Sequence, residues 1–254
     1  MTDSLDHMDQ LVGKVAAVTG ADLAIGRGLA LALGTAGASI GLLGDARALA
    51  GVVADLEALD VRATAVALDA STRETVEDAV GVVADELGAV DIVVHAATPP
   101  ESFEAIDFVD VDDARWEAVW EVTMRTTLFV LQAGFGQMRG RGGRIIVVIP
   151  TIAMSGAERL APYASAAEGQ RLLVKAAARQ WGTEGITVNC LAVAPEQLPI
   201  DVATTAVALA APALGGPGDV EHDLGPIAVF LAGDAGHHLT GATLCADGGI
   251  WMAP

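Results

Sequence analysis

The sequence has few aromatic residues, few cysteines and few residues that resemble metal ligands. Aromatic residues make up 4% of the 254 residues, so a buried core must be mainly aliphatic. The two cysteines, Cys190 and Cys245, both lie in apolar runs, which favours buried free thiols over a disulfide. No group of His and Cys residues has the spacing of a metal site, so no metal is expected.

Basic residues and long apolar runs are also scarce. The chain has 14 basic against 33 acidic residues and a net charge of −19, which argues against nucleic acid or an anionic membrane as a partner. No uninterrupted apolar run reaches the ~18 residues of a membrane span. The polar, acidic N-terminus is unlike a secretory signal. We therefore expect a cytoplasmic protein.

The order of apolar segments predicts one α/β domain. Residues 1–10 are polar and are expected to be flexible, and no linker divides residues 11–254. Seven segments that are apolar on both faces alternate with helical patterns, which indicates a parallel sheet covered by helices on both faces. Right-handed crossovers then give a single doubly wound Rossmann-type domain with strand order 3-2-1-4-5-6-7. The predicted strands are 14–19, 39–43, 64–68, 90–96, 144–149, 186–193 and 242–246.

A glycine-containing turn joins the first predicted strand to a helix. The turn runs from Thr19 to Gly26, and an amphipathic segment follows it. Glycine permits a tight turn, and the free N–H groups at the start of the helix can bind a phosphate. Gly20, Ile25 and Gly26 are therefore candidate nucleotide-binding residues, although a plain turn has the same appearance.

Carboxylates follow the second and third predicted strands. Asp45 is placed to bind the 2′-hydroxyl of an adenosine ribose and to reject a 2′-phosphate, which favours NAD over NADP. Asp69, beside Ala70, is placed to accept the adenine amino group. Both aspartates are also suited to be simple helix caps.

Seven landmarks, in order, carry a family resemblance. The chain resembles the short-chain dehydrogenase/reductase family over nearly its whole length, and in particular its 3-oxoacyl-reductase-like members. The matching segments are Gly13-Lys14-Val15 through Thr19-Gly20, Asp69-Ala70, Asp91 to Val94, Gly143 to Ile146, Val188-Asn189, Phe230-Leu231-Ala232 with Thr240-Gly241, and Asp247-Gly248-Gly249.

The resemblance implies a catalytic Tyr, Lys, Ser and Asn, and only part of this set is kept. Tyr163, the one tyrosine of the chain, stands at the tyrosine position. The lysine position four residues later is Ala167. Pro150 stands at the usual serine spacing, with Thr151 next to it as a substitute hydroxyl. Thr123 stands at the asparagine position. The resemblance therefore implies Tyr163, Thr151 and Thr123 as catalytic candidates in a divergent site.

The cofactor loops differ from the family pattern as well. Ala24 replaces the middle glycine of the first turn, and Val193-Ala194 replaces a Pro-Gly pair. His95-Ala96-Ala97-Thr98 replaces an Asn-Asn-Ala-Gly segment. His95, Ala96 and Ala97 are still expected to line the cofactor, with His95 as either a proton donor or a loop residue. We expect NAD to bind weakly, or not at all.

Two functions remain open. One is an NAD(P)-linked oxidoreductase acting on an alcohol/carbonyl pair of an apolar or acyl-type substrate, under a lid within 195–217. The other is a catalytically silent nucleotide-binding or assembly subunit, for example one paired with an active homologue. The resemblance implies a homotetramer or homodimer, with Trp251 and Met252 between subunits. The lid residues are Leu198, Ile200, Val202, Val207, Leu209 and Leu214.

Overall fold

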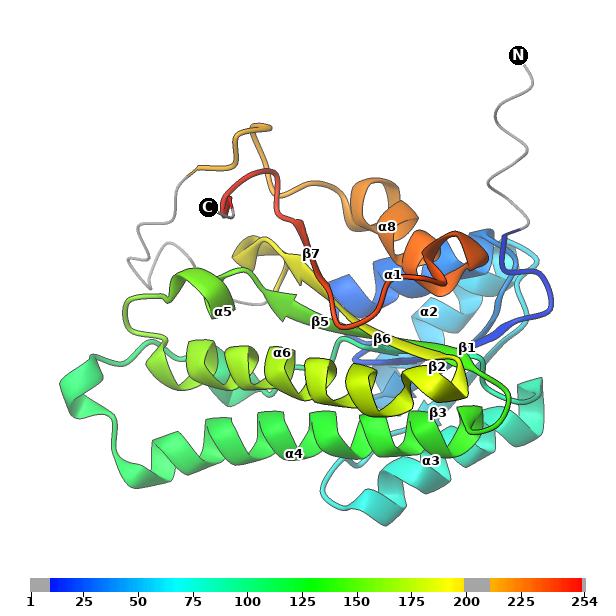
Figure 1. The fold of residues 1–254 in the computed structure, drawn as a ribbon, viewed down its shortest axis with the longest axis horizontal. Coiled ribbons are helices and arrows are strands. Elements are labelled where there is room, and N and C mark those ends of the chain that lie inside the picture. The colour runs from blue at the N-terminus through cyan, green and yellow to red at the C-terminus, as the bar shows by residue number, and fades with distance from the viewer. Residues whose placement is uncertain (1–9, 199–210, 253–254) are drawn as a thin grey trace.

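The protein folds around one seven-stranded parallel sheet in a computed structural model that describes residues 10–198 and 211–252. The strand order is β3-β2-β1-β4-β5-β6-β7, which confirms the predicted winding (Figure 1). The strands are β1 Val15–Thr19, β2 Ser39–Gly44, β3 Ala63–Ala67, β4 Ile92–His95, β5 Gly143–Pro150, β6 Ile186–Val193 and β7 Thr243–Ala246.

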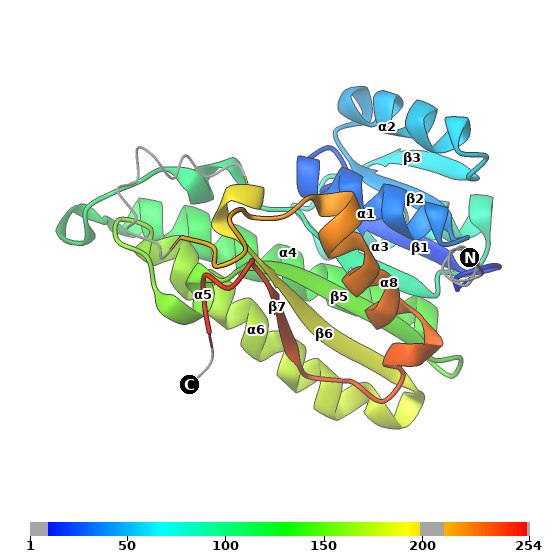
Figure 2. The ribbon, with the colours of Figure 1, turned by 90° about the horizontal axis from the view of Figure 1, so that it is seen from above.

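Helices cover both faces of the sheet, as the strand pattern predicts. On one face α1, α2 and α8 bury one apolar cluster, and on the other α3, α4 and α6 bury a second. Figure 2 shows the sheet between these layers. The helices are α1 Ala24–Thr35, α2 Ala46–Ala58, α3 Arg73–Leu87, α4 Asp113–Met138, α5 Ile152–Ser155, α6 Ala161–Trp181 and α8 Gly225–Ala232. The shorter turns are η1 Pro100–Phe103, η2 Phe108–Asp110, η3 Gly182–Glu184, η4 Pro195–Gln197, the π-helix η5 Val220–Leu224 and η6 Asp234–Gly236.

The parallel register brings the carboxyl ends of the strands to one edge. Thr19, at the end of β1, pairs with His95, at the end of β4. Pro150, at the end of β5, pairs with Val193, at the end of β6. The segments that follow these strands therefore converge, which is where doubly wound sheets bind ligands.

Several expectations need correction or lie outside the described residues. Cys245 is exposed, not buried, because β7 is an edge strand with a neighbour only in β6, whereas Cys190 is buried. The lid prediction is covered only in part: Leu198 is buried and Leu214 is 87% exposed, while 199–210 lie outside the described residues. The flexibility predicted for residues 1–10 concerns mainly residues 1–9, which also lie outside the described residues. No helix in the described part of the chain is long and apolar enough to cross a bilayer.

Candidate functional site

The turn between β1 and α1 is built from two glycines in close contact. Gly20 has φ +68°, and a Cβ on it would lie 2.6 Å from the backbone nitrogen of Ala97. A Cβ on Gly26 would lie 2.1 Å from the carbonyl oxygen of Gly20. The turn therefore packs directly against its own backbone and against the segment after β4, and only glycine fits at either position.

We predict that Gly26→Ala destabilises the protein by roughly 1–3 kcal/mol, because the added methyl group must displace the backbone of the turn. Urea unfolding measures the change. Gly51→Ala is a matched control: Gly51 lies inside α2 with nothing within 4 Å of its added Cβ. The control should stabilise the protein by up to about 1 kcal/mol through helix propensity. Equal effects of the two substitutions would contradict the packing seen at Gly26.

The start of α1 is free to bind an anion. Its N-cap residue, Leu23, makes no side-chain cap, and no acidic residue lies in the first turn. The side chain of Ile25 is fully buried in the core, so only its backbone faces this site, and the methyl group of Ala24 is exposed. The unpaired N–H groups and the positive end of the helix dipole suit a phosphate.

The two predicted carboxylates both accept hydrogen bonds from nearby backbone N–H groups, but only Asp45 is a helix cap, since Thr72 caps α3. Oδ1 of Asp45 accepts hydrogen bonds from the backbone N–H groups of Arg47 and Ala48, at 2.8 and 3.2 Å, and so caps α2. Oδ1 of Asp69 accepts a hydrogen bond from the backbone N–H of Ser71 at 2.9 Å, and this bond lowers the pKa of Asp69. Both side chains are exposed at the carboxyl edge, and Ala70 is half-buried. Both side chains are therefore held by backbone N–H groups at this edge.

Tyr163 lies in the first turn of α6 and is 2% exposed. Its hydroxyl lies 3.4 Å from Oγ1 of Thr98, in the segment after β4. The ring of Phe103 meets the tyrosine ring edge-on, with centroids 5.6 Å apart. Burial raises the pKa of Tyr163, and the hydrogen bond with Thr98 offsets this only in part. The phenol is therefore held in its protonated form.

The other catalytic candidates are buried hydroxyls without partners. Thr151 follows β5 and Thr123 lies on α4, and they are 1% and 3% exposed. Neither Oγ1 has a hydrogen-bond partner among the described residues. A buried hydroxyl left without a partner is costly, so each is suited to bind a ligand group or a water molecule. Ala167 is fully buried and supplies no charge one helical turn from Tyr163.

His95 is the centre of a buried chain of hydrogen bonds. Its Nδ1 lies 2.7 Å from Oγ1 of Thr19, and its Nε2 lies 3.2 Å from Oγ1 of Thr127 on α4. Thr127 also accepts a hydrogen bond from Nε2 of Gln170 on α6, at 2.7 Å, and donates one to the carbonyl of Thr123, at 2.8 Å. The chain thus joins β1, β4, α4 and α6.

The hydrogen bonds fix the tautomer of His95. A threonine hydroxyl has one proton, and that of Thr127 goes to the carbonyl of Thr123. Nε2 of His95 must therefore carry the proton and donate it, and Nδ1 must accept from the hydroxyl of Thr19. Burial lowers the pKa of His95 to about 4, so the ring is neutral at pH 7. The backbones of Ala96 and Ala97 after it pack against Gly20.

Sequence reasoning missed several residues of this region. Thr98 contacts Tyr163, but the sequence marks it only as part of a loop that differs from the family pattern. Thr127 lies four residues after Thr123, and Gln170 lies seven after Tyr163, so both stand on the helix faces that carry the candidates. The sequence signal for Thr127 and Gln170 is a polar side chain on the otherwise apolar, inward-facing side of a helix.

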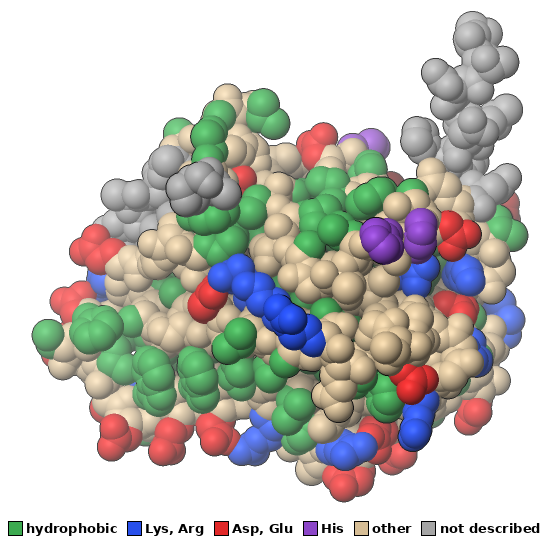
Figure 3. Space-filling view, in the orientation of Figure 1, with side chains coloured by type: hydrophobic (Ala, Val, Ile, Leu, Met, Phe, Trp, Pro, Cys, Tyr) green, Lys and Arg blue, Asp and Glu red, His purple; other side chains and the backbone are tan. Residues whose placement is uncertain are grey.

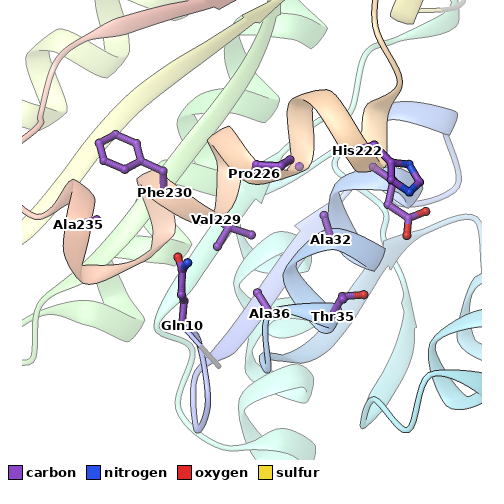
Figure 4. Close-up of a pocket in the computed structure, with 11 residues that line it drawn as sticks. Gln10, Ala32, Thr35, Ala36, His222, Pro226, Val229, Phe230 and Ala235 are labelled. Atoms are coloured by element: carbon purple, nitrogen blue, oxygen red, sulfur yellow. The ribbon is translucent and has the colours of Figure 1, made fainter. Parts of the chain in front are cut away.

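An apolar cavity of about 590 Å³ lies elsewhere, between α1 and α8. Figure 4 shows its walls, with Ala32 and Ala36 on one side and Val229 and Phe230 on the other. None of the predicted site residues lines it. The described residues also contain no cluster of His, Cys, Asp and Glu side chains suited to a metal ion.

The chain matches the family of short chain dehydrogenases over residues 14–204. Together with relatives at 30% identity or more along nearly the whole chain, this match shows that the protein belongs to the short-chain dehydrogenase/reductase family, a family of oxidoreductases.

Relatives and solved structures agree with that assignment. An L-rhamnose 1-dehydrogenase (NAD(P)(+)) of Sphingomonas sp. is 33% identical, over 96% of this chain and 99% of its own. A 3-oxoacyl-(acyl-carrier-protein) reductase of Vibrio cholerae is 31% identical, over 95% and 99%. A putative short-chain alcohol dehydrogenase of Sinorhizobium meliloti superposes with a TM-score of 0.87 at 29% identity, over 96% and 98%. A blue fluorescent protein from a metagenomic library, in complex with NADPH, gives 0.83 at 29%, over 96% and 100%.

Proposed function

We propose that the protein is a nicotinamide-dependent reductase that converts a carbonyl group of a small, largely apolar or acyl-type substrate into an alcohol. NAD is the favoured dinucleotide. The observation that carries the proposal is the buried Tyr163 hydroxyl at the carboxyl edge, held protonated within 3.4 Å of Thr98. A protonated phenol is a proton donor, and a carbonyl that is being reduced needs one.

The residues present fit the phosphate end of a dinucleotide. The Gly20–Gly26 turn is as tight as a pyrophosphate requires, and the uncapped start of α1 supplies N–H groups. Asp45 and Asp69 are exposed nearby for the ribose and the adenine. The bound dinucleotide supplies the hydride of the reaction. The protein would supply the proton from Tyr163 and a hydrogen bond to the carbonyl from Thr151, and Thr123 is the third candidate hydroxyl.

The surroundings of Tyr163 favour an apolar substrate. Phe103 contacts the tyrosine ring, and Phe108 and Val109, 79% and 89% exposed, follow it in the same segment. This segment is joined to the turn before α6 by the ion pair of Arg159 and Asp107. One relative is named for a sugar and another for an acyl carrier protein. The activity test therefore compares aliphatic substrates with hydroxylated ones.

Calorimetric titration with NAD, NADH, NADP and NADPH tests the proposal. We expect measurable but weak binding, with NADH preferred, because the methyl group of Ala24 lies where the family pattern has glycine. The reduced dinucleotide that binds more tightly is then mixed with aliphatic 3-oxoesters or with keto-sugars, and its oxidation is followed by the absorbance at 340 nm. Failure of all four dinucleotides to bind would overturn the proposal.

A second function is favoured by a separate observation. Ala167 is fully buried one turn from Tyr163, so no cation stands where the family chemistry needs one, and the phenol itself is 2% exposed. A chain that keeps the fold without turnover, acting as a nucleotide-binding or assembly subunit, would have these features. Dinucleotide binding without turnover, together with co-purification of an active homologue, would favour this alternative.

We also propose self-association through α4 and α6. Figure 3 shows hydrophobic side chains gathered on the lower left, over these helices. Val122 and Leu128 on α4 are 46% and 39% exposed, and Leu172 on α6 is 66% exposed. An apolar face of this kind marks a protein contact, and a homotetramer or homodimer would cover it. Trp251, half-buried, and Met252, 69% exposed, are available for a second contact.

Sedimentation equilibrium at micromolar concentration should give a molecular mass that is two or four times the 25.8 kDa of one chain. Leu172→Glu should lower that mass, because a charge at the centre of an apolar contact is costly to desolvate. Val82→Glu, on the exposed face of α3, is the control and should leave the mass unchanged. A wild-type monomer would contradict the prediction.

A further inference from the structure

A polar cavity of about 500 Å³ lies at the amino edge of the sheet, the edge opposite Tyr163. Its walls are the starts of β4 and β5, the loops 140–142 and 183–185, and the end of α8. Arg144 lines it, and Thr151 lies seven residues later, at the other end of β5. At about 3.3 Å per residue this separation is roughly 23 Å. The cavity is therefore a separate place from the candidate active site.

The guanidinium of Arg144 has an edge that the fold leaves unused. Its Nη1 donates a hydrogen bond to the carbonyl oxygen of Gly143 at 3.0 Å and lies 3.5 Å from that of Gly185. Its Nε is buried and has no hydrogen-bond partner in the described part of the chain. Nε and Nη2 form an edge that can bind both oxygens of one carboxylate. A buried donor without a partner costs free energy, so this edge is suited to an oxyanion of a ligand.

Thr187 brings a second unpaired group to the same place. In the register of the sheet, Arg144 stands between Ile92 on β4 and Thr187 on β6. Partners in register have their side chains on one face, and Ile92 belongs to the apolar cluster under α1 and α8. Thr187 is 6% exposed, and its Oγ1 has no hydrogen-bond partner among the described residues. Two buried polar atoms on neighbouring strands thus lack partners beside one cavity, which indicates a missing ligand.

The charges around the cavity are balanced. Three basic and three acidic side chains line it: Lys14, Arg141 and Arg144, with Asp91, Glu184 and Asp234. Arg141 and Asp91 form an ion pair at 3.4 Å, and no ion pair joins any of the other four to a described residue. The unpaired charges are therefore two cations and two carboxylates. A ligand with one charge of each sign matches this lining, whereas a simple anion meets the repulsion of a chain with net charge −19.

We propose that this cavity binds a small polar amino acid as a zwitterion. The carboxylate of the ligand accepts hydrogen bonds from the free edge of Arg144 and from the hydroxyl of Thr187. Its ammonium group faces the unpaired carboxylate of Asp234. A polar side chain suits the rest of the lining, where Lys14 and Glu184 remain unpaired. This inference does not depend on the proposed reductase activity, because none of these residues belongs to the site around Tyr163.

Calorimetric titration at pH 7 with L-glutamine and L-serine at millimolar concentration tests the site. Two analogues of L-glutamine each lack one charged group: 4-carbamoylbutanoate lacks the ammonium group and 4-aminobutanamide lacks the carboxylate. We expect both amino acids to bind, and each analogue to bind at least about tenfold more weakly than L-glutamine, because one charge-assisted contact is lost. Failure of both amino acids to bind would overturn the proposal. Equal affinity for L-glutamine and for either analogue would overturn recognition of a zwitterion.

Three variants then test the residues. Arg144→Met removes the guanidinium but keeps an unbranched stem, and it should weaken binding of L-glutamine by about tenfold or more. Thr187→Val removes only a hydroxyl that has no described partner, so it should fold normally and weaken binding severalfold. Arg62→Gln is the control, because Arg62 is an exposed cation just before β3, at the same edge but outside the cavity. Wild-type affinity in either cavity variant would overturn the role of that residue, and an equal loss in Arg62→Gln would overturn the site.

Discussion

Acidification from pH 7 to pH 5 should lower the free energy of unfolding by roughly 2 kcal/mol through His95 alone. Burial lowers the pKa of this residue from 6.5 to about 4 in the folded protein. The unfolded chain binds a proton below pH 6.5, whereas the folded protein does so only near pH 4. The unfolded state therefore holds more protons in this window, so stability falls as the pH falls. Below pH 4 the full loss is roughly 3 kcal/mol.

Urea unfolding at pH 5.0, 5.5, 6.0, 6.5 and 7.0 measures this effect in a range where most carboxylates are already ionised. His95→Asn, which keeps a neutral side chain, should be less stable than wild type at pH 7 but should lose most of the pH dependence. His238→Asn, at an exposed position, is the control and should keep the wild-type slope. Equal slopes in wild type and His95→Asn would show that the buried ring is not the group that titrates.

The sheet was predictable from the sequence because its signals are local. Each strand is a short apolar run bounded by turn residues, and each crossover carries its own helical pattern. The predicted strand order already placed the seventh strand at an edge, but the exposure of Cys245 was not predictable from the apolar run 242–246. An edge strand has one neighbour instead of two, so Cys245 is exposed although its neighbours in sequence are apolar. The position of a strand in the sheet, rather than its composition, decides that exposure.

The candidate site was less predictable because its contacts join distant segments. The family resemblance located Tyr163 and showed that Ala167 stands in place of a lysine. It could not show that His95 would be enclosed by Thr19 and Thr127, which lie 76 and 32 residues away. Pairwise contacts of this kind need the three-dimensional structure.

The second large effect concerns the ionisation of Tyr163. Burial raises the pKa of this phenol above its ordinary value of 10.0, and Ala167 provides no cation to offset the burial. Tyr163 is the only tyrosine of the chain, so ultraviolet difference absorbance at 295 nm reports on it alone. We expect no phenolate signal below pH 10, and a signal that rises together with unfolding, followed by circular dichroism. A reversible titration well below pH 9 in the folded protein would contradict the burial seen here.

Replacing Ala167 with lysine should move that titration downward and raise turnover. The new ammonium group would lie one helical turn from Tyr163 on the same face of α6, where a positive charge favours the phenolate. Because Ala167 is fully buried, a longer side chain should also destabilise the protein, so Ala167→Met is the control for length without charge. We expect the phenol of Ala167→Lys to ionise at least one pH unit below that of Ala167→Met.

In wild type, the rate of carbonyl reduction should be constant between pH 6 and 9, because the proton donor Tyr163 stays protonated. Alcohol oxidation, which needs the phenolate, should rise about tenfold per pH unit over the same range. Tyr163→Phe should abolish both reactions. Turnover that survives Tyr163→Phe, or identical titrations in the two variants at position 167, would show that Tyr163 does not carry the proton in this protein.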